Sequence, residues 1–449
     1  MSEKTSEKNR KVRNRFVWVI SAITVLIAVS AAAICLFHEI APSNEPKGPY
    51  PALATAEAIV FDDANLEAAV REQLGINDRA LTAQDAQSVT QLSLSNKDIR
   101  SVKALAYFKN IESLTLDWNR IDDISALAGM TQLKQLCLSN NQVSDINALT
   151  NLKELEQLYL DANQVSDISA LANHTKLKEL YLGGNRVSDI SAIADSKDML
   201  YLDLNNNHIS DISGLAGLTR LESLYLNKNN ISDLSALSGH ASLKYLDLSD
   251  NKISDITALD ELKVSALALS NNQIADISGL SGLKYLTSLT LDGNKISDIS
   301  PLSGMRSLMS LSLSGNTIGD IGPLSKLVHL TSLNLKNNQI RDINAISGLI
   351  DLADLNLADN RVADISALAD VEHMSTLYLS DNEIIDISPL KNLTGIHMLF
   401  LNDNKIEKID SLSGMTALSQ LHLNNNPIED YSPAAAYYDK LSDCDFVIE

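Results

Sequence analysis

The sequence predicts an α/β solenoid, in which short turns of chain stack side by side and share one long parallel sheet. Three observations predict this fold class. One period of 22 residues recurs from Leu92 almost to the end of the chain. Within each period two leucines alternate with other residues, as Leu289 and Leu291 do, which is the pattern of a strand with one buried face. An Asn follows the second Leu by three residues, as Asn294 does, and turns of this kind pack mainly against their neighbours.

The first 56 residues predict export and tethering. Residues 1–15 carry six basic and two acidic side chains, and residues 16–37 (FVWVISAITVLIAVSAAAICLF) carry no charge. At ~1.5 Å per residue a helix of this length can cross a bilayer, with its basic end in the cytoplasm. We predict a transmembrane signal anchor rather than a cleaved signal peptide, because the apolar run continues past the small residues to Phe37. Residues 38–56, with four prolines, predict an extended linker to a body that is anchored at the cell surface, or secreted if the signal is cleaved.

Residues 57–91 predict a helical N-terminal cap. In FDDANLEAAVREQLG, at residues 61–75, Asp63 is placed to N-cap a helix that Gly75 ends. The apolar face of this helix consists of Leu66, Ala69, Val70 and Leu74. A second short helix is expected after Thr82. The segment is too short to bury its own apolar face, so we expect it to cover the first repeat.

Residues 92–430 contain about 16 repeat units. In each unit we expect a short strand with both leucines inward, and further inward Ile and Leu side chains on the rest of the turn. An Asn amide can bond backbone groups of its own turn and of the next, which a tight coil would otherwise leave unpaired. This structural Asn ladder comprises Asn119, Asn141, Asn163, Asn185, Asn207, Asn229, Asn251, Asn272, Asn294, Asn316, Asn338, Asn360, Asn382, Asn404 and Asn426. One unit, between Asn251 and Asn272, has 21 residues, and a local change of curvature is expected there.

The stretch LTLDGNKISDIS, residues 289–300, superficially resembles a calcium loop. The pattern fails because Ile296 stands where an oxygen ligand is needed and Ser297 where Gly is needed. Asp298 belongs instead to a second column, for which we favour local capping of a turn or a short helix over cation binding. Its members are Asp123, Asp145, Asp167, Asp189, Asp211, Asp233, Asp255, Asp276, Asp298, Asp320, Asp342, Asp364, Asp386 and Asp430.

Composition excludes several classes of function. The formal net charge is −21, and an acidic body repels nucleic acid. Cys35, Cys137 and Cys444 show no spacing typical of a disulfide framework or a zinc site. The sequence lacks GxSxG, HExxH, P-loop and GxGxxG motifs, and His208 beside Asp203 on an open sheet is typical of surface residues rather than of a catalytic base. We therefore predict a protein that is not an enzyme and needs no cofactor or metal.

The helical segment FDDANLEAAVREQLG, followed by units reading ISDISALxxLxxLxxLxLxxNQ, resembles the leucine-rich repeat region of the internalin family of bacterial surface proteins. The resemblance covers about residues 57–449. It implies a right-handed, curved leucine-rich repeat solenoid that binds proteins on its concave strand face. The sequence differs from that family in lacking an immunoglobulin-like segment and an LPxTG signal. It ends instead in a predicted C-terminal cap, residues 431–449, where Ser432 and Pro433 open a short helix.

Function is expected on the concave face, where units four to eight present five tyrosines beside charged side chains. The predicted partner-binding residues are Tyr159, Tyr181, Tyr201, Tyr225, Tyr245, Asp203, His208 and Lys228. Exposed Tyr beside charge is typical of a binding hot spot, whereas the alternative is that Tyr only shields the sheet. The next unit has Ala266, Ala268 and Ser270 at these positions, which predicts a step beside Tyr245.

These observations together predict a monomeric cell-surface protein that recognises a protein partner, by adhesion or as a receptor. A structural spacer in the cell envelope is the alternative. A cytoplasmic regulatory scaffold would share the repeats but not residues 16–37. The sequence leaves the partner's identity open, including the choice between protein and glycan.

Overall fold

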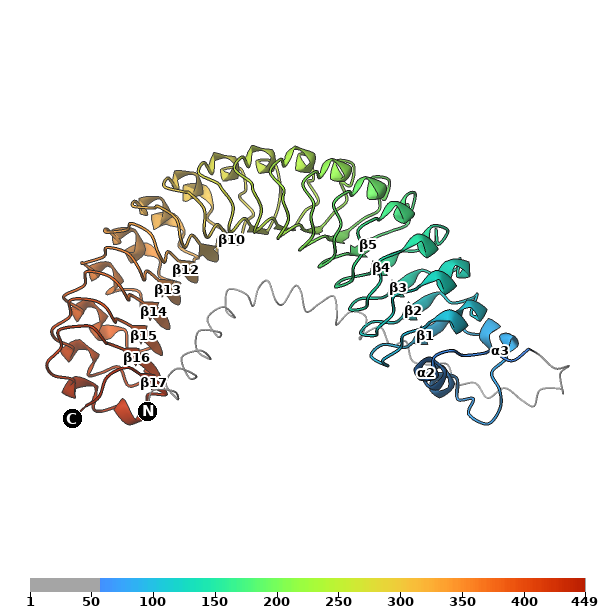
Figure 1. Cartoon of the computed structure of the whole chain (residues 1–449). Coiled ribbons are helices and arrows are strands. Elements are labelled where there is room, and N and C mark those ends of the chain that lie inside the picture. Colours follow the sequence, from blue (N-terminus) through green and yellow to red (C-terminus); the bar gives the residue numbers. More distant parts are fainter. Residues whose placement is uncertain (1–56, 449) are drawn as a thin grey trace.

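The computed structural model describes residues 57–448, and these form a curved solenoid (Figure 1). A single parallel sheet of 17 strands lines the inside of the arch, and short 3-10 helices line the outside. The predicted α/β solenoid, with its parallel sheet on the concave face, is confirmed. The predicted basic segment, membrane anchor and linker lie outside the described residues. Within residues 57–448, no helix is long and apolar enough to cross a membrane.

Each strand is short and pairs in parallel with the strand of the next unit; we number each unit after its strand. The strands are β1 (Gln91–Ser93), β2 (Ser113–Thr115), β3 (Gln135–Cys137), β4 (Gln157–Tyr159), β5 (Glu179–Tyr181), β6 (Tyr201–Asp203), β7 (Ser223–Tyr225), β8 (Tyr245–Asp247), β9 (Ala266–Ala268), β10 (Ser288–Thr290), β11 (Ser310–Ser312), β12 (Ser332–Asn334), β13 (Asp354–Asn356), β14 (Thr376–Tyr378), β15 (Met398–Phe400), β16 (Gln420–His422) and β17 (Asp443–Cys444). The pairing keeps equivalent residues opposite each other, as Leu289 and Leu311 are. Side chains 22 residues apart therefore lie one strand spacing apart, ~4.8 Å.

The convex side consists of 3-10 helices. These are η1 (Lys103–Tyr107), η2 (Ser125–Gly129), η3 (Asn147–Leu149), η4 (Ser169–Leu171), η5 (Ser191–Ile193), η6 (Ser213–Leu215), η7 (Ser235–Leu237), η8 (Thr257–Leu259), η9 (Ser278–Leu280), η10 (Ser300–Gly304), η11 (Gly322–Lys326), η12 (Asn344–Gly348), η13 (Ser366–Leu368), η14 (Ser388–Asn392), η15 (Asp410–Leu412), η16 (Ser432–Ala434) and η17 (Tyr438–Lys440). Each of these helices spans only three to five residues, as is usual for 3-10 helices, so the outer side of each unit holds little regular structure. Four of the helices, η10, η11, η14 and η16, have a Pro as their second residue, and its fixed φ suits a first helical turn.

The core runs through the middle of the solenoid as one continuous apolar cluster. In unit 10 the predicted inward residues Leu289, Leu291, Ile296 and Ile299 are buried, and so is Leu302 on the convex side. Because every unit repeats this pattern, each apolar side chain packs on its equivalents in both neighbouring units.

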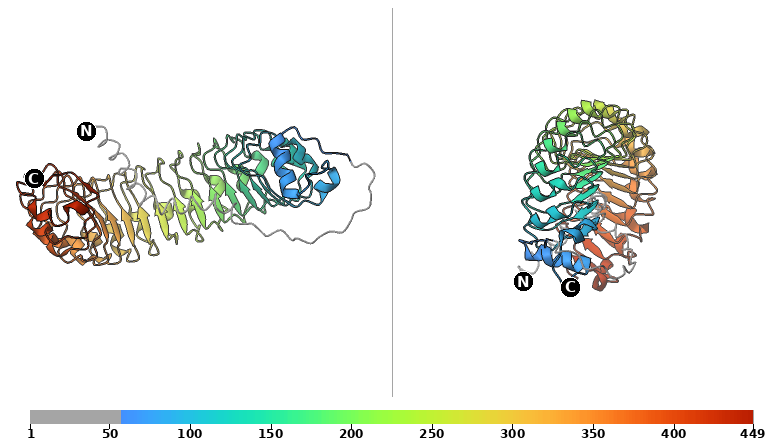
Figure 2. Two further views of the ribbon diagram at one scale, coloured as in Figure 1. Left: turned by 90° about the horizontal axis from the view of Figure 1, so that it is seen from below. Right: turned by 90° about the vertical axis from the view of Figure 1, so that its right-hand side faces the viewer.

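The N-terminal segment covers the first unit as two helices, α2 (Ala64–Leu74) and α3 (Ala83–Gln87) (Figure 2). The predicted caps of α2 are confirmed: Asp63 accepts hydrogen bonds from the N–H groups of Asn65 and Leu66, and Gly75 adopts a left-handed conformation. The second carboxylate oxygen of Asp63 accepts from the N–H groups of Arg100 and Ser101, at 2.7 and 3.0 Å. Asp63, which N-caps α2, thus also joins the N-terminal cap to unit 1.

The C-terminal residues cover the other end. The helix expected at Ser432 and Pro433 is confirmed as η16. The sequence did not predict β17, which pairs with β16 and brings Phe446 against Tyr431, with ring centroids 5.0 Å apart. Tyr437 is fully buried beneath. These aromatic side chains close the open end of the apolar core.

The Asn ladder has the structural role that the sequence predicts, with one correction. Asn294 Nδ2 donates to the carbonyls of Leu269 and Leu291, both at 3.0 Å, and its Oδ1 accepts from the N–H of Ile274 at 3.0 Å. Leu291 belongs to its own turn, but Leu269 and Ile274 belong to the preceding turn, not to the next. The same bonds recur along the ladder, where Asn141, Asn360 and Asn426 are partly buried and the others are buried.

The Asp column forms turns ahead of the 3-10 helices, as expected. Asp298 Oδ1 accepts from the N–H of Ser300 at 2.8 Å, and Oδ2 accepts from its hydroxyl at 3.0 Å. The backbone bond to Ser300 holds the pKa of the Asp298 carboxyl below its usual value. Asp292, in the same stretch LTLDGNKISDIS, accepts bonds from Ser312 and Ser314 of the next turn. Both carboxylates therefore stabilise turns of the solenoid.

Candidate functional site: the concave face

The concave face carries a stack of aromatic rings across strands β4–β7. The ring centroids of Tyr159 and Tyr181 lie 4.6 Å apart, those of Tyr181 and Tyr201 also 4.6 Å, and those of Tyr201 and Tyr225 5.4 Å. Tyr159 and Tyr181 are register partners, so the strand spacing brings their rings to the distance of offset stacking. Tyr201 is instead the register partner of Glu179, and its ring reaches Tyr181 and Tyr225 from the neighbouring outward position of β6. The Tyr159 hydroxyl donates to Glu179 at 2.8 Å and fixes that end of the stack.

The expectation that all five tyrosines would be exposed is wrong. Tyr159 and Tyr181 are each only 1% exposed and Tyr225 is 8% exposed, whereas Tyr245 is 40% exposed. The rings cover one another, so most of their surface is unavailable to a partner. Shielding of the sheet, the alternative interpretation of these residues, describes Tyr159 and Tyr181 better. Tyr245, at the end of the row, remains accessible.

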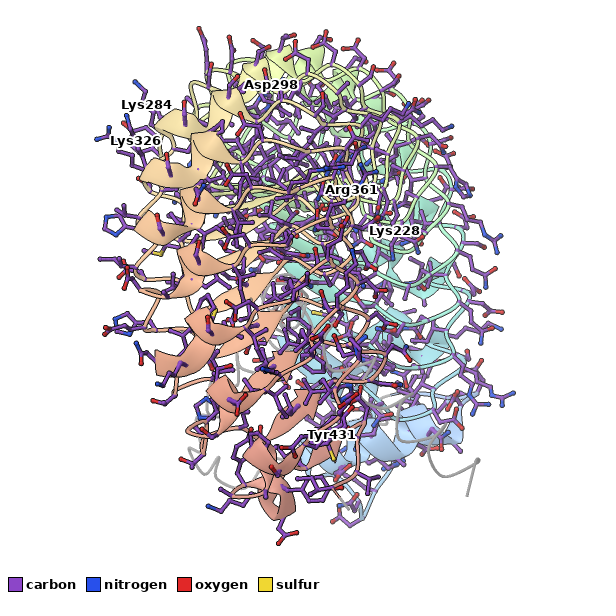
Figure 3. The ribbon with its side chains drawn as sticks, turned by 90° about the vertical axis from the view of Figure 1, so that its left-hand side faces the viewer. Lys228, Lys284, Asp298, Lys326, Arg361 and Tyr431 are labelled. Carbon is purple, nitrogen blue, oxygen red and sulfur yellow. The ribbon has the colours of Figure 1, made fainter. Side chains whose placement is uncertain are left out.

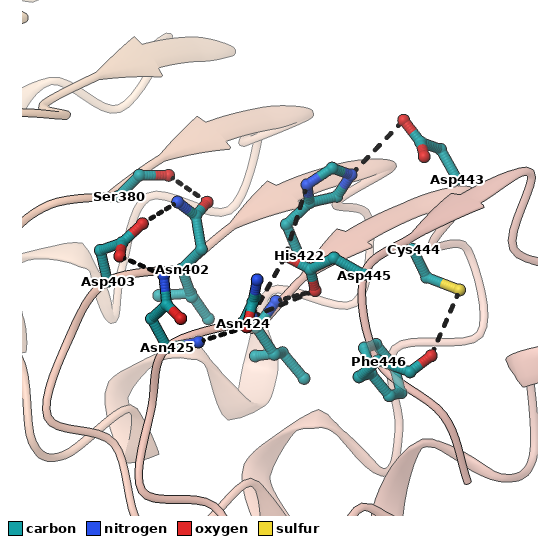
Figure 4. Close-up of polar contacts among 12 residues, drawn as sticks. Ser380, Asn402, Asp403, His422, Asn424, Asn425, Asp443, Cys444, Asp445 and Phe446 are labelled. Atoms are coloured by element: carbon teal, nitrogen blue, oxygen red, sulfur yellow. Dashed lines mark hydrogen bonds and ion pairs between the residues drawn. The ribbon is translucent and has the colours of Figure 1, made fainter. Parts of the chain in front are cut away.

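A second aromatic row lies near the C-terminal end. Tyr378 and Phe400 are stacked, with centroids 4.5 Å apart, and His422 follows at 4.8 Å. The His422 ring lies between two carboxylates of the last turn, with Nε2 3.4 Å from Asp443 and Nδ1 3.6 Å from Asp445 (Figure 4). This second row was not predicted from the sequence. The spacing of 22 residues from Tyr378 to Phe400, and again from Phe400 to His422, was the signal that could have identified the row.

Between the two rows the concave face has a hollow of about 200 Å³, which extends from β7 to β13. Tyr225, Tyr245 and Asp247 line one end, and Asn334 and Asp354 line the other. Its floor consists mainly of small side chains: Ala266, Ala268, Ser288, Thr290, Ser310 and Ser312. The predicted step beside Tyr245 is thus confirmed, and it continues across four further strands. The sequence predicted the step at unit 9 alone, and the small residues of units 10 and 11 are the signal for its continuation.

The carboxylates on this face are held in a row by bonds between turns. Asp117 accepts from the N–H of Ser139, and Asp161 from that of Gly183, both at 2.8 Å. Burial raises the pKa of Asp117 to about 6. Burial, and next the nearby charge of Asp203, raise the pKa of Asp161 to about 7. Asp247, at the wall of the hollow, has its pKa raised by burial as well. The negative charge of the concave face is therefore weaker at neutral pH than the number of acids implies.

The other predicted partner-binding residues lie around the tyrosines. Asp203 accepts bonds from the backbone and side-chain amides of Asn205, at 2.9 and 2.6 Å, and burial raises its pKa to about 6. His208 is exposed beyond the end of β6. Lys228 is exposed too, with a left-handed backbone at φ 57°. Asp203 is thus bound to Asn205, and His208 and Lys228 are at the rim of the face.

Comparisons with known proteins agree with this geometry. A family profile for leucine-rich repeats, two copies at a time, matches residues 131–173, 175–217, 219–261, 266–304, 306–349 and 394–435. The crystal structure of the internalin InlF from Listeria monocytogenes shares 30% sequence identity, and the match covers 89% of this chain and 100% of that chain with a TM-score of 0.50. A comparison with curated protein sequences found no match.

Two further solved structures show the same fold. The functional domain of InlJ from Listeria monocytogenes has 20% identity and a TM-score of 0.66, and the match covers 87% of this chain and 82% of that one. The ectodomain of the Arabidopsis receptor kinase HAESA, solved with an IDA peptide hormone, has 24% identity and a TM-score of 0.62, with 73% of this chain and 60% of that chain covered. Leucine-rich repeats commonly serve as scaffolds for protein recognition rather than as enzymes. This chain belongs to the leucine-rich repeat family and, within it, to the internalin-like proteins.

Proposed function

We propose that this chain recognises a protein partner on its concave face, with the hollow between β7 and β13 as the principal contact. The hollow carries this proposal because it is a depression with an apolar and hydroxyl lining and a few fixed polar groups, which is the usual make-up of a binding site. Its volume of about 200 Å³ suits a bulky side chain of a partner rather than a whole small ligand. The HAESA ectodomain, solved with a peptide hormone, supports a peptide or protein as the occupant.

The tyrosine row has two roles in this proposal. Tyr225 and Tyr245 form the wall against which an inserted side chain packs, since both line the hollow. Tyr159, Tyr181 and Tyr201 hold that wall in place through the stack. Around the row, Asp203, His208 and Lys228 offer polar contacts to the partner. Large aromatic side chains at the centre of an interface are the residues that most often dominate binding energy.

The test fills the hollow with an additional Tyr side chain. Ala268→Tyr puts a further ring in line with Tyr225 and Asp247 and occupies the hollow, whereas Ser93→Tyr adds the same side chain at the equivalent exposed position on β1. Both variants and the wild type serve as bait for cross-linking and pull-down from surface extracts. We expect a partner captured by the wild type to be retained by Ser93→Tyr and lost by Ala268→Tyr. Equal capture by all three baits would contradict the hollow, and no specific capture by any would favour a structural spacer.

We further propose that the body is displayed outside the cytoplasm by residues 16–37. The support is the uncharged run that follows a basic start, together with the likeness to internalins. Added protease should cleave the repeats on intact cells while the basic N-terminus stays protected. Protection of the repeats until the cells are opened would contradict this location.

A further inference from the structure

The two halves of the solenoid differ along one flank. The residues between each 3-10 helix and the next strand are called the ascending flank, for example residues 281–287 ahead of β10. Equivalent flank residues of neighbouring units lie about one strand spacing apart, ~4.8 Å, because the strands are in register. Charged side chains at these positions can therefore pair from unit to unit.

In units 2–8 the ascending flank pairs its own charges. Lys134 Nζ lies 2.7 Å from Glu112, Lys178 lies 2.6 Å from Glu156, and Lys244 lies 2.6 Å from Glu222. One column over, Lys176 pairs with Glu154 and Arg220 with Asp198. Each exposed pair adds little stability, but the pairs neutralise most of the acids on this half of the flank. Lys109 and Lys197 are exposed there without an ion pair to a residue of the described chain, so the apolar side chains distinguish the other half more than its cations do.

In units 10–13 the same flank has a different surface. Lys284 and Arg306 on this flank, and Lys326 at the end of η11 beside it, are exposed, and none of them forms an ion pair with another residue of the range 57–448. Figure 3 shows Lys284 and Lys326 projecting from this side of the ribbon. Beside these cations lie four exposed apolar side chains: Tyr285 (64% exposed), Met309 (54%), Val328 (38%) and Ile350 (57%). Asp351, the acid on this stretch of flank, is 3.4 Å from His329.

This flank patch, the three cations with the four apolar residues, borders the hollow. The carbonyl of Met309 accepts hydrogen bonds from both the N–H and the hydroxyl of Thr331, at 2.8 and 3.1 Å. Thr331 itself lines the hollow. A partner that occupies the hollow therefore reaches the patch without leaving the surface of units 11 and 12.

We propose that the flank patch docks an acidic protein segment that carries apolar side chains, and that this segment continues into the hollow. Exposed apolar side chains gathered on one face mark interaction sites, and here they alternate with cations that lack a partner within the described chain. Carboxylates of the segment would pair with Lys284, Arg306 and Lys326 while its apolar side chains cover Tyr285, Met309 and Ile350. The continuation into the hollow rests on the proposed function, but the flank contact does not.

Anionic lipid is a competing occupant, because basic and apolar side chains together also suit a membrane surface. The chain's net charge of −21 opposes approach to an anionic bilayer. The strongly curved sheet beside the patch also gives a protein segment a second surface that a bilayer could not enter. A protein segment is therefore favoured, and lipid becomes one outcome of the test.

The test uses the full-length chain and labelled synthetic peptides with alternating Glu and Leu, alternating Lys and Leu, or alternating Glu and Ser. Binding is followed by fluorescence anisotropy at low and high salt. The charge variant combines Lys284→Glu, Arg306→Glu and Lys326→Glu, and the apolar variant combines Tyr285→Ser, Met309→Ser and Ile350→Ser. A matched control, Lys295→Glu with Arg341→Glu, reverses exposed cations on the opposite flank of the same units.

We expect the wild type and the control to prefer the Glu–Leu peptide over both others, and added salt to weaken that binding. The charge variant should bind it at least about tenfold more weakly and should gain affinity for the Lys–Leu peptide. The apolar variant should lose the preference for Leu over Ser. Equal binding of the Glu–Leu and Lys–Leu peptides to the wild type, or an equal loss in the control, would overturn the proposal.

Two further experiments distinguish this proposal from its alternatives. Vesicles of phosphatidylglycerol that bind the wild type and not the charge variant, while the peptides show no preference, would assign the patch to lipid and overturn a protein partner. Ala268→Tyr, which fills the hollow, separates the two sites. Peptide binding lost in the patch variants but kept in Ala268→Tyr would support the flank patch and contradict the hollow. The reverse result would overturn the flank patch alone.

Discussion

At the scale of single residues, the solenoid depends on side chains that bond the backbone between turns. Each Asn of the ladder satisfies two carbonyls and one N–H, as Asn294 does for Leu291 and Leu269 and for Ile274 of the preceding turn. Irregular backbone between a strand and a 3-10 helix has no regular ladder of its own, so these groups depend on the Asn column as a whole. Each carbonyl accepts from two successive Asn amides, whereas the N–H has one partner.

Asn294→Ala should destabilise the solenoid by about 1–3 kcal/mol, because it leaves the buried N–H of Ile274 without a partner. The carbonyls of Leu269 and Leu291 lose one of two amide donors and keep those of Asn272 and Asn316. Urea unfolding measures the loss, and the amide of Ile274 should exchange with solvent much faster. Lys295→Ala, an exposed neighbour, should stay within about 0.5 kcal/mol of the wild type. A similar cost in both variants would contradict the role given to the ladder.

Asp161 should make stability fall as pH rises toward and above neutrality. Its folded pKa of about 7 lies above the usual 3.8, so its stabilising contribution is complete below about pH 4 and is lost as the pH rises through about 7. Asp161→Asn keeps an oxygen that accepts from the N–H of Gly183. It should make the free energy of unfolding less dependent on pH between about pH 5 and pH 8.

Asp298→Asn is the control for that profile, because the backbone bond from Ser300 lowers the pKa of Asp298. The stabilising contribution of Asp298 is present above about pH 4 and is lost as the pH falls below that value. This variant should therefore change the free energy of unfolding only at acidic pH. Identical profiles for the two variants would contradict the opposite shifts.

At the scale of elements, the tyrosines of the concave face have two roles. Those buried in the aromatic stack support the sheet, and those exposed at its end can bind a partner. Tyr181→Ala removes a buried ring between two others and should cost about 3 kcal/mol of unfolding free energy. Tyr245→Ala removes a ring that is 40% exposed and should cost less than about 1 kcal/mol, yet weaken partner binding. Urea unfolding and a binding assay on both variants test this division. A large loss of stability in Tyr245→Ala would place it in the supporting stack instead.

The backbone at the start of η8 lies close to Gly279 of η9. A Cβ added to Gly279 would meet the carbonyl oxygen of Ile256 at 2.7 Å and its carbon at 3.0 Å. Gly279→Ala should therefore destabilise the solenoid by about 1–3 kcal/mol, as overpacking generally does. Gly304→Ala is the matched change, since nothing lies within 4 Å of its added Cβ. It should be neutral or slightly stabilising in urea unfolding. Equal effects would show that η9 has room to relax.

At the scale of the whole molecule, the solenoid is quasi-one-dimensional, because each unit contacts only its neighbours. Damage at one end should therefore stay local. Leu66→Asp places a charge at a fully buried position of α2 and should open the cap and the first units. Hydrogen exchange should then show faster exchange in β1–β3 and unchanged protection in β10–β16. Loss of protection in all strands together would mean that the solenoid unfolds as one cooperative body.

Several features follow from the sequence alone, because they depend on bonds within a turn or between identical positions. The inward leucines, the Asn ladder, the turn at each Asp and the cap on Asp63 recur at the spacing of a single unit. A regular period gives every turn the same backbone path, so one unit predicts the rest. The fold class and the inward or outward direction of nearly every side chain were predictable in this way.

Other features were decided by the tertiary structure, because they depend on which side chains become neighbours across turns. His174 and His240 replace apolar residues of the convex column, yet both are fully buried and face backbone carbonyls of the preceding turn. The tyrosines lie on the outward face of the sheet as predicted, but stacking at the strand spacing removed most of their surface from solvent. The hollow and the flank patch arise where several successive units lack large side chains or opposite charges. A single unit determines where a side chain points, but what covers it, pairs with it or leaves it open to a partner depends on the residues one turn away.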